Sequence, residues 1–281
     1  MMKPKENRKA KVKVAFLFLS LITAGLYFWA RFVETKGFIV KEYALSSNKI
    51  PPLMDGMKIV QLSDIHYGST TYVKELQAIV KATNELKPTI VVFTGDLVEE
   101  GVILKDSEID QITKVLKKIT APFKYAVSGN HDTKASHYQQ ILKNSSFTIL
   151  NSEMALVYYL DNQPLAIYGF PSAIKNKVKY DILKEKNPYY KIVLMHEPDP
   201  IDKLANYNVD LVLTGHSHNG QIRLPFIGAT YTPPLARNYY KEHYVVNGTQ
   251  LYISSGLGTS LAKLRFLNKP SFNLYRLNVT K

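Results

Sequence analysis

The chain has 281 residues, of which 46% are hydrophobic and 21% charged, so it is long enough to bury a sizeable core. It has no cysteine, which excludes disulfide bonds, thiolate metal sites and a cysteine nucleophile, and any metal must be bound by nitrogen and oxygen ligands. The net charge is +13, of which residues 1–13 contribute +5; the remaining +8 favours anionic membranes, nucleic acid or phosphorylated substrates, or is simply a soluble surface.

The first 31 residues predict a membrane anchor. Residues 14–30 carry no charge, and no polar residues alternate through them as they would in a buried core helix. A cleavable signal peptide is the other alternative, but aromatic residues 27–29 stand where the peptidase needs small ones, and they suit an interfacial belt. The preceding basic cluster places the N-terminus inside, and we expect a single-pass cell-membrane protein with an extracytoplasmic domain. This cluster comprises Lys3, Lys5, Arg8, Lys9, Lys11 and Lys13.

The next stretch predicts a connector and then one large domain. Residues 32–56 contain Pro51-Pro52, which is typical of a segment between structural elements, and we expect residues 57–281 to form the domain. The length is also compatible with two domains, but the sequence contains no linker or internal repeat that would indicate them. Strand and helix patterns then alternate, as in an α/β fold. The expected strands are 57–63, 89–94, 122–127 and 148–150, and the expected helices are 70–86, 106–119 and 134–143.

After residue 150 the pattern changes to hairpins. Segments 155–160 and 165–168 flank a turn sequence, and apolar strands follow at 191–195 and 209–214. The tyrosine-rich stretch 231–244 predicts a long loop near a site entrance, or plain surface. A C-terminal meander is expected from strands 244–246, 250–254 and 273–279. Together the elements predict two sheets packed face to face with helices outside.

Five apolar strands are followed at their carboxyl ends by potential metal ligands. This is the edge at which open α/β sheets bind ligands. Each block by itself can be explained as a turn former, a helix cap or a hydrogen-bonded histidine. These explanations do not account for five such blocks at the same edge of the fold. The blocks are Asp64-Ile65-His66, Gly95-Asp96, Gly129-Asn130-His131-Asp132, His196 and Gly215-His216-Ser217-His218.

This ordered set resembles the calcineurin-like metallophosphoesterase superfamily over roughly residues 57–257. The resemblance implies a four-layer α/β/β/α sandwich of two mixed sheets, with a dinuclear metal centre and no further cofactor. The segments 220–225, 256–260 and 264–266 are similar to a bacterial membrane-anchored branch with YkuE-like and YaeI-like proteins and relatives that hydrolyse UDP-2,3-diacylglucosamine. Ser255 departs from this pattern, because some relatives have an arginine there that would contact a substrate phosphate.

The resemblance also implies a ligand set. Two divalent ions about 3.5–4 Å apart need a shared anionic ligand, and they lower the pKa of a bridging water so that hydroxide can attack phosphorus in line. Imidazole and carboxylate ligands fit Mn²⁺, Zn²⁺ or Fe, and the sequence does not choose among them. By the resemblance, Asp64, His66 and His218 hold one ion, Asn130, His196 and His216 hold the other, and Asp96 bridges both.

The remaining polar residues receive catalytic or surface roles. His131 is not needed as a ligand and is the candidate to donate a proton to the leaving oxygen or to stabilise the transition state. Asn130 and Asp132 complete the candidate catalytic block, with Asp132 orienting the His131 ring. Arg223 is either a contact to a substrate phosphate or a surface arginine. Glu197 is expected to be structural.

The favoured function is a dimetal-dependent phosphohydrolase acting on a phosphomonoester, phosphodiester or pyrophosphate. The substrate is expected to be a phosphorylated small molecule or a lipid-linked envelope precursor, because the anchor holds the site near the bilayer. Nucleic acid is not expected, since no aromatic and basic recognition motif is present. The alternative is a catalytically inactive metal-binding or scaffold protein on the same fold, although the complete ligand set and His131 argue against it.

Overall fold

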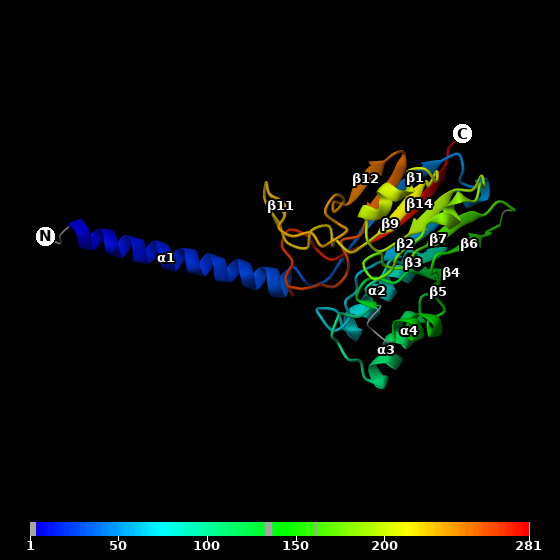
Figure 1. Ribbon diagram of the computed structural model, residues 1–281. Helices are drawn as coiled ribbons and strands as arrows, with labels where there is room; N and C mark the ends of the chain where they lie inside the picture. Colours follow the sequence, from blue (N-terminus) through cyan, green and yellow to red (C-terminus); the bar gives the residue numbers. More distant parts are fainter. Residues whose placement is uncertain (1–3, 133–136, 161, 281) are drawn as a thin grey trace.

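A long N-terminal helix projects from one end of two β-sheets packed face to face (Figure 1). The computed structural model describes residues 4–132, 137–160 and 162–280. Helix α1 (Pro4–Phe28) continues into a π-helical turn, η1 (Trp29–Val33). The stretch Arg8–Val33 is long and apolar enough to cross a membrane, as a signal sequence would also be, and its most apolar window is not buried against the domain.

The first sheet has six strands in the order β1-β14-β2-β3-β4-β5. Strands β2 to β5 run parallel to one another, so the carboxyl ends of β2, β3 and β4 lie along one edge, while β14 is antiparallel to β2 and parallel to β1. The strand bounds are β1 (Ile39–Ser47), β2 (Lys58–Leu62), β3 (Ile90–Phe93), β4 (Phe123–Ala126), β5 (Thr148–Ile149) and β14 (Ser271–Val279).

The second sheet also has six strands, in the order β12-β13-β9-β8-β7-β6. Strands β7, β8, β9 and β13 are parallel, which brings the ends of β8 and β9 together. The bounds are β6 (Glu153–Val157), β7 (Leu165–Gly169), β8 (Lys191–Leu194), β9 (Leu211–Thr214), β12 (His243–Val246) and β13 (Thr249–Ile253). A separate hairpin pairs β10 (Arg223–Leu224) with β11 (Gly228–Ala229).

Strand β3 shows how the layers are held together. All four of its side chains are buried; Val91 and Phe93 join the cluster beneath the helices, and Ile90 and Val92 join the cluster between the sheets. Because alternate strand residues point to opposite faces, a run that is apolar throughout is expected of a strand covered on both sides. The covering helices are α2 (Val73–Glu85), α3 (Asp106–Leu116) and α4 (Tyr138–Asn144).

The two-sheet α/β fold expected from the sequence is confirmed; among the residues that the structure describes, 3-10 helices and not α-helices cover the outer face of the second sheet. Two short 3-10 helices, η4 (Asp181–Lys184) and η5 (Asp199–Leu204), cover that face together with loops. Pro188 follows η4 and prevents its continuation toward β8, whereas Pro198 and Pro200 stand at the start of η5, where proline is tolerated. The outer layer on the second sheet therefore consists of short helices and loops.

Two other segments differ from expectation. The expected connector 32–56 contains η2 (Pro52–Met54) and β1, which pairs with β14 over nine residues, so the folded domain begins before residue 57. The expected C-terminal meander is split, because β14 leaves β12 and β13 and pairs in the first sheet between β1 and β2. Helix 134–143 begins at Tyr138 in the structure; residues 134–136 lie outside the described residues.

Candidate metal centre

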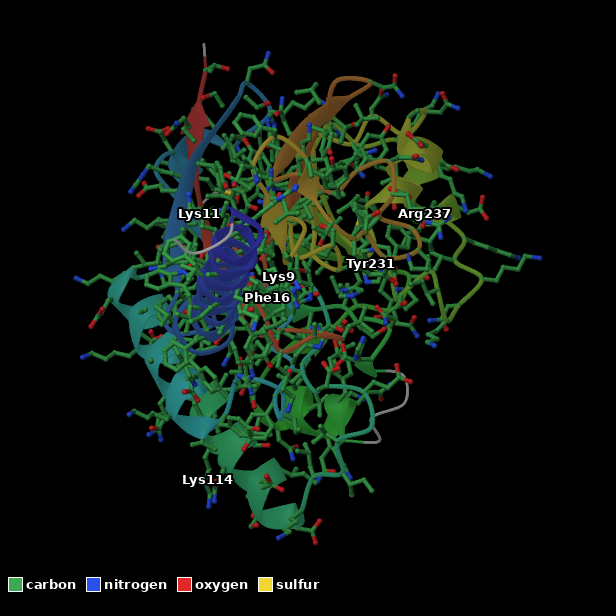
Figure 2. All side chains as sticks on the ribbon, turned by 90° about the vertical axis from the view of Figure 1, so that its left-hand side faces the viewer. Lys9, Lys11, Phe16, Lys114, Tyr231 and Arg237 are labelled. Atoms are coloured by element: carbon green, nitrogen blue, oxygen red, sulfur yellow. The ribbon has the colours of Figure 1, made fainter. Side chains whose placement is uncertain are left out.

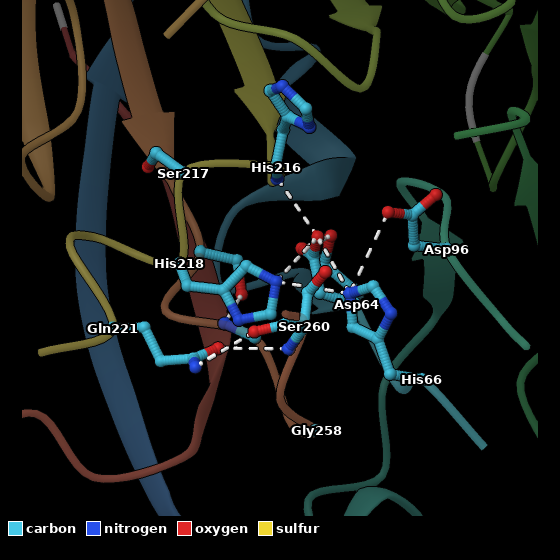
Figure 3. A network of polar contacts seen from close by, with 12 residues as sticks. Asp64, His66, Asp96, His216, Ser217, His218, Gln221, Gly258 and Ser260 are labelled. Carbon is cyan, nitrogen blue, oxygen red and sulfur yellow. Dashed lines mark hydrogen bonds and ion pairs between the residues drawn. The ribbon is translucent and has the colours of Figure 1, made fainter. Parts of the chain in front are cut away.

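Polar side chains from five strand ends meet at one centre between the sheets. Figure 3 shows those that follow β2, β3 and β9. The first sheet supplies Asp64 and His66 after β2 and Asp96 after β3, and the second supplies His216 and His218 after β9; all five side chains are buried. The ends of parallel strands lie at the same edge, which is why residues far apart in the sequence converge. His196 follows β8 and is buried, and Asn130 follows β4 and lines the same cavity.

The first group of donors consists of Asp64, His66 and His218, whose ligand atoms all lie within 4.8 Å of one another. The two imidazole Nε2 atoms are 3.1 Å apart, and Asp64 Oδ1 lies 3.4 Å from His218 Nε2. Two nitrogens and one carboxylate oxygen in this arrangement match a common cation ligand set. The structure thus brings together the residues expected to hold one ion.

The second group consists of Asp96, His196 and His216. His196 Nδ1 donates to the carbonyl of Thr94 at 2.7 Å, and His216 Nε2 donates to the carbonyl of Pro234 at 2.9 Å. Each bond assigns the proton of a neutral ring to the nitrogen that faces away from the centre. The opposite nitrogens, Nε2 of His196 and Nδ1 of His216, are left to bind metal.

The pKa shifts of the carboxylates and of two imidazoles in the centre favour the binding of cations. Burial tends to raise the pKa of Asp64, but its interaction with the imidazole of His218 outweighs this and the pKa lies below the usual range. Burial likewise opposes ionisation of Asp96, yet the nearby imidazole of His196 holds its pKa well below normal. Both carboxylates are therefore anionic. Burial lowers the pKa of His216, and lowers that of His218 to about 4, so these imidazoles are neutral and available as ligands.

Glu99 was not identified from the sequence. Its Oε2 lies 2.6 Å from His66 Nδ1, so it supports this ring of the site from outside; His131 Nδ1 is farther away, at 3.8 Å. A carboxylate on the far nitrogen of a ligand histidine fixes the ring orientation and increases its basicity. The only sequence signal was its position three residues after Asp96.

The Asn130-His131-Asp132 block surrounds Asp96. The Asp132 carboxylate accepts hydrogen bonds from the backbone N–H groups of Asp96, Leu97 and Gly129 at 2.7–2.9 Å, so it fixes two strand-end loops, whereas the His131 ring meets other partners. Burial, aided by the charge of Asp96, raises the pKa of Asp132 to about 7. The His131 ring is instead held by the backbone N–H of Glu100, which donates to its Nδ1 at 3.0 Å.

His131 is positioned as a hydrogen-bond donor. Its Nδ1 accepts the N–H of Glu100 at 3.0 Å, which places the proton of the neutral ring on Nε2, and Nε2 lies 3.8 Å from Asp96 Oδ2. Burial lowers the pKa of His131, so the ring is neutral near pH 7. A neutral imidazole with its Nε2–H directed at the centre can donate to an oxygen on phosphorus.

Arg265 is fully buried beside His218. Its guanidinium donates to the carbonyls of Ser255, Gly256 and Gly258, and Nη2 lies 3.3 Å from His218 Nδ1. In the sequence this arginine was marked only by its position in segment 264–266, which is similar to the bacterial membrane-anchored branch. Ser255 is buried and supplies a carbonyl to Arg265.

Arg223 and Glu197 lie apart from the donor atoms. The Arg223 guanidinium donates to the carbonyl and side-chain oxygens of Asn219 at 2.9 and 3.0 Å, and Arg223 does not line the cavity at the centre. The structure thus gives no support to a substrate contact by Arg223. Glu197 accepts hydrogen bonds from the Ser172 hydroxyl and the Ala173 N–H, as expected of a structural carboxylate.

A cavity of about 610 Å³ opens over the donor groups. Its lining includes Asp96, His131, His216 and His218 together with an apolar part, which we call the apolar wall. This volume suits a drug-sized ligand or one portion of a larger one, with polar anchors at one end. The apolar wall comprises Ile174, Ile222, Tyr231, Pro233, Pro234, Leu261 and Ala262.

The comparisons agree with this geometry. A model of the calcineurin-like phosphoesterase family matches residues 57–220. The uncharacterized metallophosphoesterase YkuE of Bacillus subtilis is 32% identical over 267 residues, 93% of both chains. Phosphodiesterase YaeI of Escherichia coli is 27% identical over 78% of this chain and 82% of its own. The UDP-2,3-diacylglucosamine pyrophosphatase LpxG of Chlamydia muridarum is 26% identical over 79% of this chain and 84% of its own.

A solved structure shares the fold. The structure of GAP50, the anchor in the inner membrane complex of Plasmodium, superposes with a TM-score of 0.51 at 13% identity. The superposition covers 79% of this chain and 81% of that one. At this identity the likeness concerns the fold alone.

Proposed function

The chain belongs to the calcineurin-like phosphoesterase family, and from this premise we propose that it hydrolyses a phosphoester or pyrophosphate bond with two divalent metal ions. The observation that carries the proposal is the position of Asp96. Its Oδ2 lies 3.2 Å from His196 Nε2 and 3.7 Å from His66 Nε2, so one anionic carboxylate faces both donor groups. A shared carboxylate is what two adjacent cations require.

The donor chemistry fits this pair of ions. The donors are carboxylate oxygens, imidazole nitrogens and an amide oxygen, which suit divalent ions such as Mn²⁺, Zn²⁺ or Fe²⁺. When bound, such ions supply charge stabilisation at phosphorus and lower the pKa of water. We assign Asp64, His66 and His218 to one ion, Asn130, His196 and His216 to the other, and Asp96 to both.

The chain's own residues perform the remaining work. His131 and Asp96 both line the cavity, with His131 Nε2 3.8 Å from Asp96 Oδ2, and the Nε2–H would donate to the oxygen that leaves phosphorus or to a phosphoryl oxygen. Asp132 holds the loops of Asp96 and Gly129 in place through three backbone N–H groups. The apolar cavity wall excludes water from one side of the substrate.

We also propose that α1 anchors the protein in the cell membrane and that the substrate is lipid-linked. Three observations support this: the unburied apolar stretch Arg8–Val33, the apolar cavity wall, and the relative named as a pyrophosphatase of a diacylated UDP-sugar. The basic residues before the span support a domain that lies outside the cytoplasm. Membrane fractionation combined with intact-mass measurement tests this, because a cleaved signal sequence would leave a shorter, extractable chain.

Metal analysis and turnover together test the hydrolase. Purified full-length protein is analysed for metals, and its turnover of chromogenic phosphomonoesters and phosphodiesters and of a diacylated UDP-sugar is measured with added Mn²⁺ or Zn²⁺. We expect close to two ions per chain and metal-dependent turnover. Two bound ions without turnover on any substrate would instead favour a scaffold on the same fold, and a chain that stays metal-free would refute the proposed centre.

A further inference from the structure

The β10–β11 hairpin exposes apolar residues on the side of the domain from which α1 leaves (Figure 1). At its turn, Phe226 is fully exposed and Ile227 is 72% exposed. Large apolar side chains at a hairpin tip are unfavourable in water, and they point to a contact that covers them. Figure 2 views this side of the molecule along α1, and Tyr231, just after the hairpin, lies on the same face.

The hairpin is continuous with the apolar wall of the cavity. Ile222 and Thr230 flank its two strands, are joined by a 3.0 Å backbone hydrogen bond, and both line the cavity. Tyr231 and Leu261, 56% and 80% exposed, extend the same wall outward. An apolar path thus leads from the metal centre toward the hairpin tip.

The hairpin is also fixed relative to α1. The Arg223 N–H donates to the carbonyl of Phe266 at 2.9 Å, and the Arg265 N–H donates to the carbonyl of Ala30 at 3.0 Å. Loop 261–269 therefore connects the hairpin to the domain end of the helix. The same loop exposes Lys263 and Lys269, and cations beside apolar side chains are typical of surfaces that lie at an anionic bilayer.

We propose that the β10–β11 hairpin enters the interfacial region of the bilayer that α1 spans, so that the cavity opens at the membrane surface. The substrate is then an amphiphile whose apolar part stays in contact with the bilayer and the apolar wall while its phosphate reaches the metal centre. This inference rests on the proposed function and on α1 as the anchor.

The absence of cysteine allows a direct test on the full-length protein. Phe226→Cys, Phe16→Cys and Leu160→Cys variants are each labelled with one fluorophore and reconstituted in vesicles of phosphatidylcholine and phosphatidylglycerol containing spin-labelled lipid. Phe16 lies in α1 and reports the anchor. Leu160 is 75% exposed in the turn before β7, at the sheet edge opposite the metal centre, and is the matched control.

We expect lipid quenching at positions 16 and 226, with quenching at 226 at least about threefold greater than at 160. Quenching at 16 but equal quenching at 226 and 160 would overturn the hairpin inference while leaving the anchor intact. No quenching at 16 would refute the anchor, and the inference with it. None of these results depends on enzymatic activity.

A second measurement concerns the substrate class. The ratio of turnover on a vesicle-embedded diacylated UDP-sugar to turnover on a soluble chromogenic diester is compared among the unmodified protein, Phe226→Ser with Ile227→Ser, and Leu160→Ser. We expect the ratio to fall about tenfold in the hairpin variant and to stay unchanged in the control. Equal ratios in all three proteins would overturn the inference. Absence of turnover on both substrates in the unmodified protein would refute the proposed function instead.

Discussion

Each of three histidines in the metal centre is held by a partner on the nitrogen that faces away from it. His66 is held by the Glu99 carboxylate, His196 by the carbonyl of Thr94, and His216 by a loop carbonyl. A substitution cannot remove the two backbone carbonyls, but it can remove the carboxylate of Glu99. It is therefore the residue at which the orientation of a ligand can be tested without touching the ligand itself.

Glu99→Gln tests this support. Glutamine keeps the size of the side chain but removes the charge beside His66 Nδ1, so we expect metal affinity to fall about 10–100-fold, which is measured by metal titration with a competing chelator. Glu85→Gln is the control, because Glu85 is exposed and pairs only weakly with Lys81 at 3.9 Å. Equal affinities in the two variants would exclude the supporting role.

Asp96→Asn removes the charge shared by the two donor groups. Asparagine preserves shape, but two neighbouring cations lose the anion that offsets their repulsion. We expect turnover to become undetectable and the metal content to fall toward one ion per chain or less, as measured by elemental analysis. A variant with two ions and normal turnover would show that Asp96 is not shared.

His131→Ala separates catalysis from metal binding. The ring donates through Nε2 but is not assigned to either donor group, so we expect turnover to fall about 10²–10⁴-fold with the metal content unchanged. Elemental analysis and steady-state kinetics on the same preparation check both parts. Metal loss as large as that of Asp96→Asn would make His131 a ligand instead.

The sequence motifs predicted the ligands but not their supports. Asp64, His66 and His218 follow apolar strands in a recognisable order, and the structure brings them together as expected. Glu99 and Arg265 reach the site only through tertiary packing. No local pattern distinguishes Glu99 from a surface residue, and segment 264–266 marked Arg265 without indicating its place beside His218. Arg223 was a candidate contact to a substrate phosphate because of its position in the sequence, but its guanidinium donates a hydrogen bond to the carbonyl of Asn219.

At the scale of elements, the strand-end loops hold the ligands in unusual backbone conformations. Asp64, His66, Asp96, His216 and His218 all have φ between 44° and 65°, the left-handed region that non-glycine residues rarely adopt. Such strain costs of order 1 kcal/mol or more at each residue, and the surrounding structure must impose it. The loops are therefore shaped by the packing of the two sheets and not by local preference.

Gly95→Ala tests how tightly two of these loops pack. Gly95 has φ of 100°, and a Cβ there would lie 2.5 Å from the Gly129 backbone nitrogen and 2.6 Å from His196 Nδ1. We expect a loss of about 3–5 kcal/mol in the free energy of unfolding, measured by denaturant titration. Gly101→Ala is the matched control, since Gly101 has φ of 80° but open space around it, so it loses only the conformational part. Equal losses would show that the contact is unimportant.

Elements with a strong apolar pattern were predictable, and two-residue or exposed edge elements were not. Helix α2 buries one apolar face and strand β3 is apolar throughout, and both lie close to where they were expected. Strand β1 is an edge strand with mostly exposed or partly exposed residues, so its pattern resembled a connector. Hairpin β10–β11 pairs only two residues on each side, too few for any periodic signal. These weaker elements are stabilised by the neighbours that they contact.

At the scale of the whole molecule, the proposed metal centre draws its donors from both sheets. Asp64 and His66 come from the first sheet and His218 from the second, while Asp96 from the first sheet meets His196 and His216 from the second. Each donor group thus contains residues from both halves of the sandwich. A bound ion would bind both sheets at once and would have no comparable site in the unfolded chain.

Metal removal should therefore destabilise the entire fold. An ion present at 100 times its dissociation constant stabilises the native state by about 2.7 kcal/mol, which for a chain of this size corresponds to roughly 5–10 °C in Tm. We expect the Tm measured by calorimetry to fall by at least this much when a chelator is added, and to recover with Mn²⁺ or Zn²⁺. Asp96→Asn should show a much smaller metal-dependent shift, because its donor groups lack the shared carboxylate. A Tm that is identical with and without chelator, in a protein from which the chelator is shown to remove two ions, would mean that the ions bind the unfolded chain as well as they bind the native fold.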